Sequence, residues 1–461
     1  MLSWFGSSGI RGPYDKITPI FCMKLGMAVG KSLKNTTPAY IASDIRYTSD
    51  LLKACFISGF CYSSGTIIDI GLCPTPIISH ITSSNKDSLG VIVTASHNPP
   101  SNNGFKFFLN GGECGKDFEK KVENHLQQRL VRFFDNMRFP SQWKKVGIAQ
   151  YKKSESYINE YVNYLYNKVH IKNQDRKIVL DCVNNVPNLV SPYVLRHFGF
   201  KVILINESLD PTFPGRPSEP TSENLATLKK QVIKEGADLG IAHDGDGDRF
   251  ALIDERGEFI NSTTIINFFL DNLDFSDPER RKIILTSDCT SQAFEIAKEN
   301  SAHIVTSRIG RNRDFVNDEE VLFLAEPNKL LFPKFGKWID GLYPVLKFIE
   351  QSGLEKVSKV LEPYDKRKIL RKAFIIKEEK RSEVENSIIQ LPDLWSENIL
   401  DVSYLDGLKI FLKDQSHVLI RFSGTEPKIK FYIESNSETM NQNILNDLKD
   451  IFSLHSTGFD C

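Results

Sequence analysis

The chain lacks an excess of charge of either sign, and it lacks long apolar runs. Its 461 residues include 58 lysines and arginines against 58 aspartates and glutamates, so the formal net charge is zero. Proteins that bind nucleic acid or anionic membranes electrostatically carry basic patches, and the balance found here argues against both partners. No apolar segment approaches the roughly 20 residues that a helix needs to cross a bilayer.

Paired cysteines and a secretion leader are missing as well. The eight cysteines include no Cys-x-x-Cys pair, and several lie in apolar stretches. This usage is typical of reduced cytosolic thiols and argues against a disulfide framework or a zinc site. The N-terminal residues have no basic start followed by an apolar core and a small-residue cleavage site, so we expect no signal peptide. A cytoplasmic protein is the expectation.

What the chain does contain is three polar loops of a kind that handles phosphate. They are Thr94-Ala-Ser-His-Asn-Pro99, Asp244-Gly-Asp-Gly-Asp-Arg249 and Arg421-Phe-Ser-Gly-Thr-Glu-Pro427, called here the serine, aspartate and arginine loops. In the aspartate loop, three carboxylates alternate with glycines that let the backbone curl. Such a cluster of hard oxygen ligands suits Mg²⁺ or Ca²⁺.

A calcium-binding EF-hand is the main alternative for the aspartate loop. Its three aspartates would occupy positions one, three and five, and Glu255 would fall at position twelve. The sixth position needs glycine for its sharp turn, however, and here it is Arg249. Apolar strands are expected on both sides of the loop, and Asp254-Glu-Arg-Gly257 is typical of a hairpin turn. A structural role in capping turns stays open for one or two of the aspartates.

Ser96 in the serine loop needs activation before its hydroxyl can act as a nucleophile. His97 follows it directly, so in an extended chain the ring points away, and we infer no Ser-His-acid triad. A transient phosphoserine is the better hypothesis, because its anionic oxygens would suit a metal held by the aspartates. Lys106, in Asn103-Gly-Phe-Lys106, could reach the same phosphate or a sugar oxygen, or it could simply face solvent.

The arginine loop offers hydrogen-bond donors to a tetrahedral dianion. Its glycine-containing turn presents backbone N–H groups, and Arg421, Ser423 and Thr425 add side-chain donors. The alternative is a plain β-turn between two strands. An arginine ahead of Ser-Gly-Thr favours anion binding.

Apolar runs alternate with helical stretches through most of the chain, whose length predicts about three domains, with four admissible. Strands are predicted at residues 39–42, 66–70, 89–93, 177–180, 201–205, 238–242, 282–285, 303–306 and 321–324. Alternating strands and helices indicate mostly parallel sheets, with ligand loops at the carboxyl ends of strands. Beyond about residue 363, strands predicted at 408–412, 417–420 and 429–433 follow one another across short turns, which is typical of a smaller α+β domain.

Taken together and in this order, the motifs resemble those of the α-D-phosphohexomutase family, which includes phosphoglucomutases, phosphomannomutases and phosphoglucosamine mutases. The resemblance also rests on Phe5-Gly-Ser-Ser-Gly-Ile-Arg-Gly12, on Cys73-Pro-Thr-Pro76 and on a proline-rich segment at 210–220. It implies three α/β domains with mixed, mostly parallel sheets and a C-terminal α+β lid domain around a central cleft. The implied domains are 1–145 with the serine loop, 146–248 with the aspartate loop, 249–362 with a sugar-binding loop and 363–461 with the arginine loop.

The resemblance also implies a role for each site residue. Ser96 would be the phosphoserine, and it would bind Mg²⁺ together with Asp244, Asp246 and Asp248. The groups around the transferring phosphoryl group would be Arg11, His97, Lys106 and Arg249, and those holding the other phosphate would be Arg421, Ser423, Gly424 and Thr425. The implied enzyme is an Mg²⁺-dependent phosphomutase that interconverts hexose 1-phosphate and 6-phosphate through a bisphosphorylated sugar. Expected partners are hexose phosphate and hexose bisphosphate, with the chain a monomer or a homodimer.

The sugar-reading loop departs from the family pattern, which commonly contains Gly-Glu-x-Ser-Gly. Here the stretch is Leu324-Ala-Glu-Pro-Asn-Lys329, in which Glu326 is retained and Asn328 stands where serine is expected. Arg311 stands where some members place histidine or aspartate. We expect Glu326, Asn328 and Arg311 to contact the sugar, and glucose, mannose and glucosamine phosphates stay open. Two further hypotheses are a sugar-phosphate-binding relative with weakened turnover and a metal-dependent sugar phosphatase.

Overall fold

The structure is a computed structural model that describes residues 4–6, 8–33, 37–63, 65–131, 147–172, 175–353, 355–376, 378–423, 427–452 and 459–460. The chain folds into two compact units. The first comprises residues 1–262, 313–323 and 328–360, and the second comprises 263–312, 324–327 and 361–461. The four predicted domains divide the chain differently, since residues 249–362 fall partly in each unit, and they stay a prediction.

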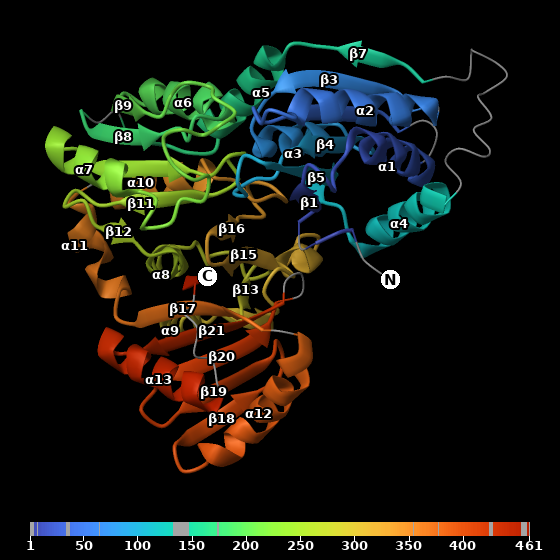
Figure 1. Cartoon of the computed structure of the whole chain (residues 1–461). Coiled ribbons are helices and arrows are strands. Elements are labelled where there is room, and N and C mark those ends of the chain that lie inside the picture. Colours follow the sequence, from blue (N-terminus) through green and yellow to red (C-terminus); the bar gives the residue numbers. More distant parts are fainter. Residues whose placement is uncertain are drawn as a thin grey trace. The chain divides into compact units, whose positions relative to one another are not determined.

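The first unit begins with a mixed sheet that carries the serine loop (Figure 1). The strand order is β1-β5-β4-β2-β3-β7, with β6 paired to β5. Strands β2, β3, β4 and β7 pair in parallel, whereas β5 is antiparallel to β1, β4 and β6. The elements are β1 Ile10–Pro13, α1 Pro19–Ser32, β2 Ala39–Ser43, α2 Ser49–Tyr62, β3 Ile67–Leu72, α3 Thr75–Ser84, β4 Leu89–Val93, β5 Asn102–Leu109, β6 Gly112–Glu113, α4 Lys116–Val131 and β7 Ala149–Tyr151.

Helices α1 and α2 pack closely together beside this sheet. The side chain of Thr18 caps α1 by accepting from the backbone N–H of Phe21 at 3.2 Å. Glycines permit the close approach, since a Cβ at Gly59 would lie 1.9 Å from the carbonyl oxygen of Met23. A Cβ at Gly26 would lie 2.2 Å from the carbonyl oxygen of Phe56. The two helices and the sheet enclose an apolar core rich in phenylalanine.

A Gly59→Ala substitution is expected to lower the free energy of unfolding by about 3 kcal/mol, the upper end for overpacking, because the obstructing atom belongs to the backbone. Urea denaturation followed by circular dichroism would measure this loss. Gly115→Ala is the matched control, since a Cβ there meets nothing within 4 Å. Equal free energies of unfolding for the two variants would contradict the inference that the close packing of α1 and α2 requires glycine at position 59.

A second sheet of the first unit carries the aspartate loop. Its strand order is β12-β11-β10-β8-β9, with β8, β9 and β10 parallel and β11 and β12 antiparallel. The elements are α5 Ser154–Tyr166, β8 Lys177–Asp181, η2 Val186–Leu189, α6 Ser191–His197, β9 Lys201–Ile205, α7 Ala226–Glu235, β10 Leu239–His243, β11 Phe250–Ile253 and β12 Phe259–Ile260. The aspartate loop therefore joins two strands, and the predicted hairpin turn at 254–257 is confirmed. This setting removes the EF-hand alternative, which requires flanking helices.

The second unit contains a parallel pair of strands and an antiparallel sheet. Strands β13 and β14 pair in parallel, and the C-terminal sheet has the order β18-β19-β20-β21-β17-β22 with antiparallel neighbours. Helices α12 and α13 contribute to one apolar cluster and so cover the same face of that sheet (Figure 1). The elements are β13 Lys282–Thr286, α9 Ser291–Glu299, β14 His303–Ser307, η4 Glu362–Tyr364, β17 Lys368–Ile375, η5 Glu378–Lys380, α12 Arg381–Leu394, β18 Ile399–Ser403, β19 Leu408–Leu412, β20 His417–Phe422, β21 Lys428–Ser435, α13 Glu438–Ile451 and β22 Phe459–Asp460.

Several elements lie near the boundaries between the two units. They are α8 Ser262–Asp271, η3 Asn312–Phe315, β15 Val321–Glu326, β16 Lys329–Leu331, α10 Tyr343–Ser352 and α11 Val357–Leu361. The predicted fold class is confirmed: helix-covered α/β sheets are followed by a C-terminal α+β part. Strands β4, β9 and β19 begin and end at the predicted residues.

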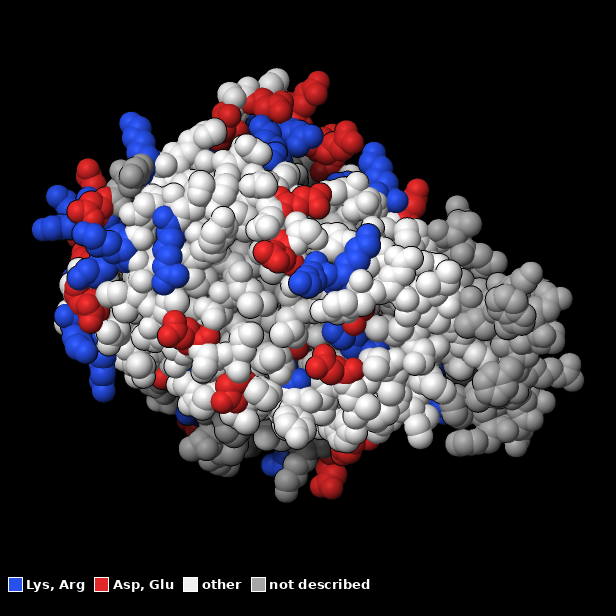
Figure 2. All heavy atoms as spheres, turned by 90° about the horizontal axis from the view of Figure 1, so that it is seen from above, with Lys and Arg blue, Asp and Glu red and all other residues white. Residues whose placement is uncertain are grey.

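The charge distribution on the surface and the state of the cysteines agree with what the composition predicts. On the face drawn in Figure 2, basic and acidic side chains are interspersed, and neither sign forms a continuous patch. Every cysteine that the structure describes is a free thiol. None of the helices in the described ranges combines the length and the apolar character that crossing a bilayer demands.

Candidate active site

Ser96 lies in the loop that follows β4, and its side chain points at the aspartate loop. Its hydroxyl donates a hydrogen bond to Asp244 Oδ2 at 2.7 Å, although 148 residues separate the two. The serine is buried and has a left-handed backbone with φ of 51°. A non-glycine residue in this region carries strain of about 1–3 kcal/mol, and it persists only where its surroundings fix it.

The expectation that the His97 ring points away from Ser96 is wrong. That expectation assumed an extended chain, whereas the left-handed turn at Ser96 brings His97 Nδ1 to 3.4 Å from the serine hydroxyl. Arg11 Nη1 lies 3.4 Å from the same ring nitrogen. Burial lowers the pKa of His97, and the nearby cations of Arg249, Arg11 and Lys106 lower it further. A lowered pKa favours the neutral imidazole.

The three aspartates of the aspartate loop converge. One carboxylate oxygen from each lies within 4.8 Å of the others. Asp244 Oδ1 accepts a hydrogen bond from the backbone N–H of Arg249 at 3.0 Å. Burial raises the pKa of Asp244, and the charges of Asp248 and Asp246 raise it further. Such crowding of buried carboxylates calls for positive charge.

Lys106 supplies part of that charge, and the alternative that it faces solvent is wrong. It lies on β5 opposite Ile92 of β4, and only 1% of the residue is exposed. Its ammonium donates to Asp246 Oδ2 at 2.6 Å and to Asp248 Oδ2 at 2.5 Å. Burial alone would lower the pKa of Lys106, but the two carboxylates outweigh it and raise the pKa. The lysine is charged.

The remaining carboxylate oxygens fit a divalent cation. Asp246 Oδ1 and Asp248 Oδ1 are buried, and neither has a hydrogen-bond partner among the described residues. Buried oxygens of this kind cost free energy unless a donor or a metal satisfies them. Asp244, Asp246 and Asp248 could therefore hold a hard cation such as Mg²⁺, as the sequence predicted.

Two polar residues that sequence reasoning missed complete this part of the site. Glu219 accepts from Arg249 Nη1 at 2.7 Å, and its other oxygen lies 3.6 Å from His97 Nε2. Thr75 donates its hydroxyl to Asp246 Oδ2 at 2.5 Å. Both lie in segments that the sequence had marked, the proline-rich stretch and the Pro-Thr-Pro turn. Those proline motifs were the available signal, although they did not identify which side chain would point inward.

The second unit brings together several of the predicted sugar and phosphate residues. Glu326 Oε2 accepts from the backbone N–H of Gly310 at 2.8 Å, beside Arg311. Asp406 Oδ2 accepts from the N–H of Ile309 at 2.9 Å and lies 3.4 Å from Arg421 Nη1. Asp406 thus links Arg421 to the turn that carries Arg311. Nothing in the sequence distinguished this aspartate from the other turn residues.

Four further residues are predicted to contact the sugar or its second phosphate: Ser423, Gly424, Thr425 and Asn328. Ser423 donates its backbone N–H to the carbonyl of Lys428 at 2.8 Å, which closes the base of the arginine loop. Gly424 and Thr425 lie outside the described residues. Asn328 occupies the turn between β15 and β16 with φ of 66° and belongs to the first unit. Asparagine tolerates this left-handed conformation better than most residues.

Comparison with protein families gives three matches along the chain. Residues 3–131 match the phosphoglucomutase/phosphomannomutase alpha/beta/alpha domain I, and residues 156–257 match domain II of the same family. Residues 377–451 match the family's C-terminal domain.

Curated relatives and solved structures give the same picture. A phosphopentomutase of Thermococcus kodakarensis is 35% identical, with 94% of each chain covered. A probable phosphoglucosamine mutase of Methanopyrus kandleri is 30% identical, with 98% of each chain covered. The crystal structure of a phosphoglucomutase/phosphomannomutase family protein from Burkholderia thailandensis has a TM-score of 0.83 at 20% identity, covering 99% of this chain and 100% of that one. The Aspergillus fumigatus N-acetylphosphoglucosamine mutase, solved with GlcNAc-6P and magnesium, has a TM-score of 0.62 at 13% identity, covering 98% and 95%.

Proposed function

The chain belongs to the phosphoglucomutase/phosphomannomutase family, whose members are phosphomutases, and we propose that it moves a phosphoryl group between two hydroxyls of a hexose phosphate through Ser96. The observation that carries this proposal is the 2.7 Å hydrogen bond from Ser96 to Asp244. It places a strained, buried hydroxyl against a three-carboxylate cluster that fits a cation.

In the proposed reaction, Ser96 begins as a phosphoserine and donates its phosphoryl group to the free hydroxyl of a sugar monophosphate. The bond between phosphorus and Oγ breaks as a bond forms to the sugar oxygen, and the proton lost by the sugar is balanced by one gained at Oγ. The resulting bisphosphate reverses its orientation in the site, so that its other phosphate faces Ser96. Ser96 then takes back that phosphoryl group. The net change is between hexose 1-phosphate and hexose 6-phosphate.

Charge neutralisation is the main task of the surrounding side chains, because phosphoryl transfer depends chiefly on alignment and electrostatics. Lys106 binds Asp246 and Asp248 directly. The charge of Arg249 lowers the pKa of Asp244, and the charge of Arg11 lowers that of Asp246. His97 in its neutral form could donate or accept a hydrogen bond without adding charge. Glu219 fixes Arg249 through the 2.7 Å contact and so orients it.

Mg²⁺ is the cation that we propose for the aspartates. Asp244, Asp246 and Asp248 would hold it, and when bound it would neutralise charge on the transferring phosphate oxygens. The magnesium found with the Aspergillus enzyme supports this choice. The two buried oxygens without partners support a bound cation of some kind independently.

Arg421 and Ser423 are proposed to hold the phosphate that does not react, together with Gly424 and Thr425. Glu326, Arg311 and Asn328 are proposed to contact the sugar hydroxyls. Support for the grouping of Arg421 with the Arg311 turn comes from their shared contact with Asp406.

A pentose phosphate is the second candidate substrate. The phosphopentomutase relative supports it, since it matches nearly the whole chain. The phosphoryl-transfer chemistry is the same for either substrate.

A substrate panel tests the proposal. Intact-mass analysis should find one phosphoryl group, mapped to Ser96 by peptide sequencing. Glucose, mannose, glucosamine and ribose 1-phosphates would then be assayed with Mg²⁺ and a trace of the matching bisphosphate. We expect isomerisation of at least one of them. Release of free phosphate would favour the phosphatase hypothesis, and tight binding without any isomerisation would favour the relative with weakened turnover.

Arg421→Ala is expected to raise KM for the sugar phosphate about 10- to 100-fold, since a hydrogen bond from a charged donor contributes roughly 1.5–3 kcal/mol. The value of kcat should change less, because the held phosphate is remote from the reacting one. Lys413→Ala, which removes an exposed cation just after β19 of the same sheet, is the control. Equal KM values for the two variants would remove Arg421 from the proposed phosphate site.

A further inference from the structure

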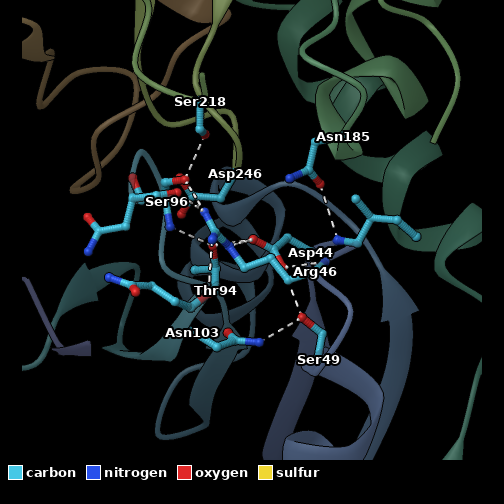
Figure 3. Close-up of polar contacts among 12 residues, drawn as sticks. Asp44, Arg46, Ser49, Thr94, Ser96, Asn103, Asn185, Ser218 and Asp246 are labelled. Carbon is cyan, nitrogen blue, oxygen red and sulfur yellow. Dashed lines mark hydrogen bonds and ion pairs between the residues drawn. The ribbon is translucent and has the colours of Figure 1, made fainter. Parts of the chain in front are cut away.

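Arg46 lies beneath the serine loop and binds the backbone of that loop at several points. The residue follows β2, its side chain is fully buried, and its guanidinium faces the loop (Figure 3). Nη2 donates to the carbonyl oxygens of Ser96 at 2.7 Å and Asn98 at 2.8 Å. Nη1 donates to the carbonyl oxygens of Pro99 at 2.5 Å and Asn102 at 2.9 Å. One side chain thus binds four backbone positions across the loop.

Asp44 fixes the guanidinium of Arg46 and also binds the serine loop directly, through Thr94. Asp44 Oδ2 accepts from Arg46 Nε at 2.9 Å and from the hydroxyl of Thr94 at 2.7 Å. The hydroxyl oxygen of Thr94 in turn accepts the backbone N–H of Ser96 at 2.9 Å. Both the N–H and the carbonyl of Ser96 are therefore connected to the Asp44–Arg46 pair.

The segments that connect the strands of the second sheet also contact Ser96 and the Asp44–Arg46 pair. The hydroxyl of Ser218 donates to the carbonyl oxygen of Ser96 at 2.9 Å (Figure 3). Asn185 Oδ1 accepts the backbone N–H of Ile45, between Asp44 and Arg46, at 3.2 Å. A Cβ at Gly245 would lie 2.7 Å from the carbonyl oxygen of Ser96, so the aspartate loop also closes tightly on this peptide.

Within this network, the contacts to Ser96 itself are made to its backbone N–H and carbonyl oxygen, and none of them uses Oγ. During the proposed cycle, Oγ alternates between a neutral hydroxyl and a phosphate with about two negative charges. A loop held only through Oγ would shift whenever that charge appeared or left. A loop held through its carbonyl oxygens keeps one position in both states.

We propose that Arg46 is a positioning residue for phosphoryl transfer: it fixes the carbonyl oxygens of the serine loop and thereby holds Ser96 in the left-handed conformation that aims Oγ at Asp244. This inference rests on the proposed function. Its guanidinium is fully buried, and its hydrogen-bond partners are Asp44 and four backbone carbonyl oxygens of the loop region, so it acts on the rate through Ser96.

Arg46→Lys is the primary test, because lysine keeps the charge but cannot span four carbonyl oxygens. We expect kcat to fall about 100-fold, as for an ångström-scale misplacement of a reacting group. KM should stay within about threefold of the wild-type value, since the Arg46 side chain is fully buried beneath the loop. Hydrogen exchange followed by mass spectrometry should show faster exchange in peptides covering 94–104, with the rest of the first unit unchanged.

Lys53→Met is the matched control. Lys53 lies on α2, is 7% exposed and forms an ion pair with Asp69 at 3.2 Å, without contacting the serine loop. This variant loses a buried cation near the same sheet, and we expect wild-type kcat and wild-type exchange at 94–104. Ser218→Ala is the second test variant, and it should lower kcat about tenfold without leaving a buried charge unpaired.

The inference is overturned if folded Arg46→Lys matches Lys53→Met in both kcat and loop exchange, or if its defect lies in KM. Should Arg46→Lys fail to fold, a wild-type kcat for Ser218→Ala overturns it instead. Wild-type protein that isomerises no sugar phosphate refutes the proposed function alone, because the exchange comparison then still decides whether Arg46 fixes the loop.

Discussion

Replacing Ser96 by alanine is expected to reduce turnover by about 10⁴-fold or more, the effect of removing a covalent nucleophile. The reason is chemical, because alanine has no oxygen to carry the phosphoryl group. Binding should be nearly unchanged, since the contacts proposed for the sugar and its second phosphate come from other residues. The variant should also fold, because the hydroxyl makes few of the contacts that hold the loop.

Single-turnover kinetics and intact mass would measure this result. The Ser96→Ala protein should show no added phosphoryl group after incubation with a sugar bisphosphate, whereas wild type should show one. Ser101→Ala, at an exposed serine shortly after the same loop, is the control and should behave as wild type. Turnover within tenfold of wild type, or a phosphoryl group on another residue of Ser96→Ala, would refute the phosphoserine hypothesis.

Much of the fold could be predicted from the sequence, because short apolar runs mark the buried strands. The strand at 89–93 is a short apolar run that ends at a polar loop, and β4 is fully buried across those residues. The strands on both sides of the aspartate loop were predicted in the same way, and they decided against the EF-hand. Local sequence patterns were sufficient for features, such as strands and hairpin turns, that depend on residues close together in the chain.

Contacts between distant residues could not be predicted in that way. The pair formed by Lys106 and Asp246 joins positions 140 residues apart. Burial of a lysine is uncommon, so the sequence alone left exposure open as an alternative. The predicted orientation of the His97 ring was wrong for a different reason. It depends on the left-handed backbone of Ser96, which no local sequence signal marks. Only the surrounding contacts stabilise that conformation.

The residues that hold the site were harder to find than those proposed to react. Glu219 lies in the proline-rich segment that the sequence marked, and Arg46 lies shortly after a predicted strand, yet their partners are carbonyl oxygens and side chains from elsewhere in the chain. Asp406 had no motif at all, because an aspartate before a glycine in a turn is common. A site residue with a chemical signature can be read from sequence, whereas a supporting residue is defined by its geometry.

Asp246→Asn is expected to lower turnover about 10³-fold, in keeping with the several kcal/mol that a metal ion contributes to such reactions. The substitution keeps the volume of the side chain and removes one negative charge. It should also abolish most of the stabilisation by Mg²⁺, which in wild type should reach about 2.7 kcal/mol at a concentration 100 times Kd. Thermal unfolding with Mg²⁺ and with EDTA measures this second effect without any assay of activity.

Asp254→Asn provides the matched control for the magnesium experiment. Asp254 is 3% exposed and accepts backbone N–H groups of Arg256 and Glu258 in the hairpin turn that follows the site. The Asp254→Asn substitution should lower the unfolding temperature equally with Mg²⁺ and with EDTA. The increase in unfolding temperature caused by Mg²⁺ should therefore remain as large as in wild type. A full shift in Asp246→Asn would mean that the cation binds elsewhere. In that case the unpartnered oxygens of Asp246 and Asp248 would need another explanation, and Lys106 would be their main source of positive charge.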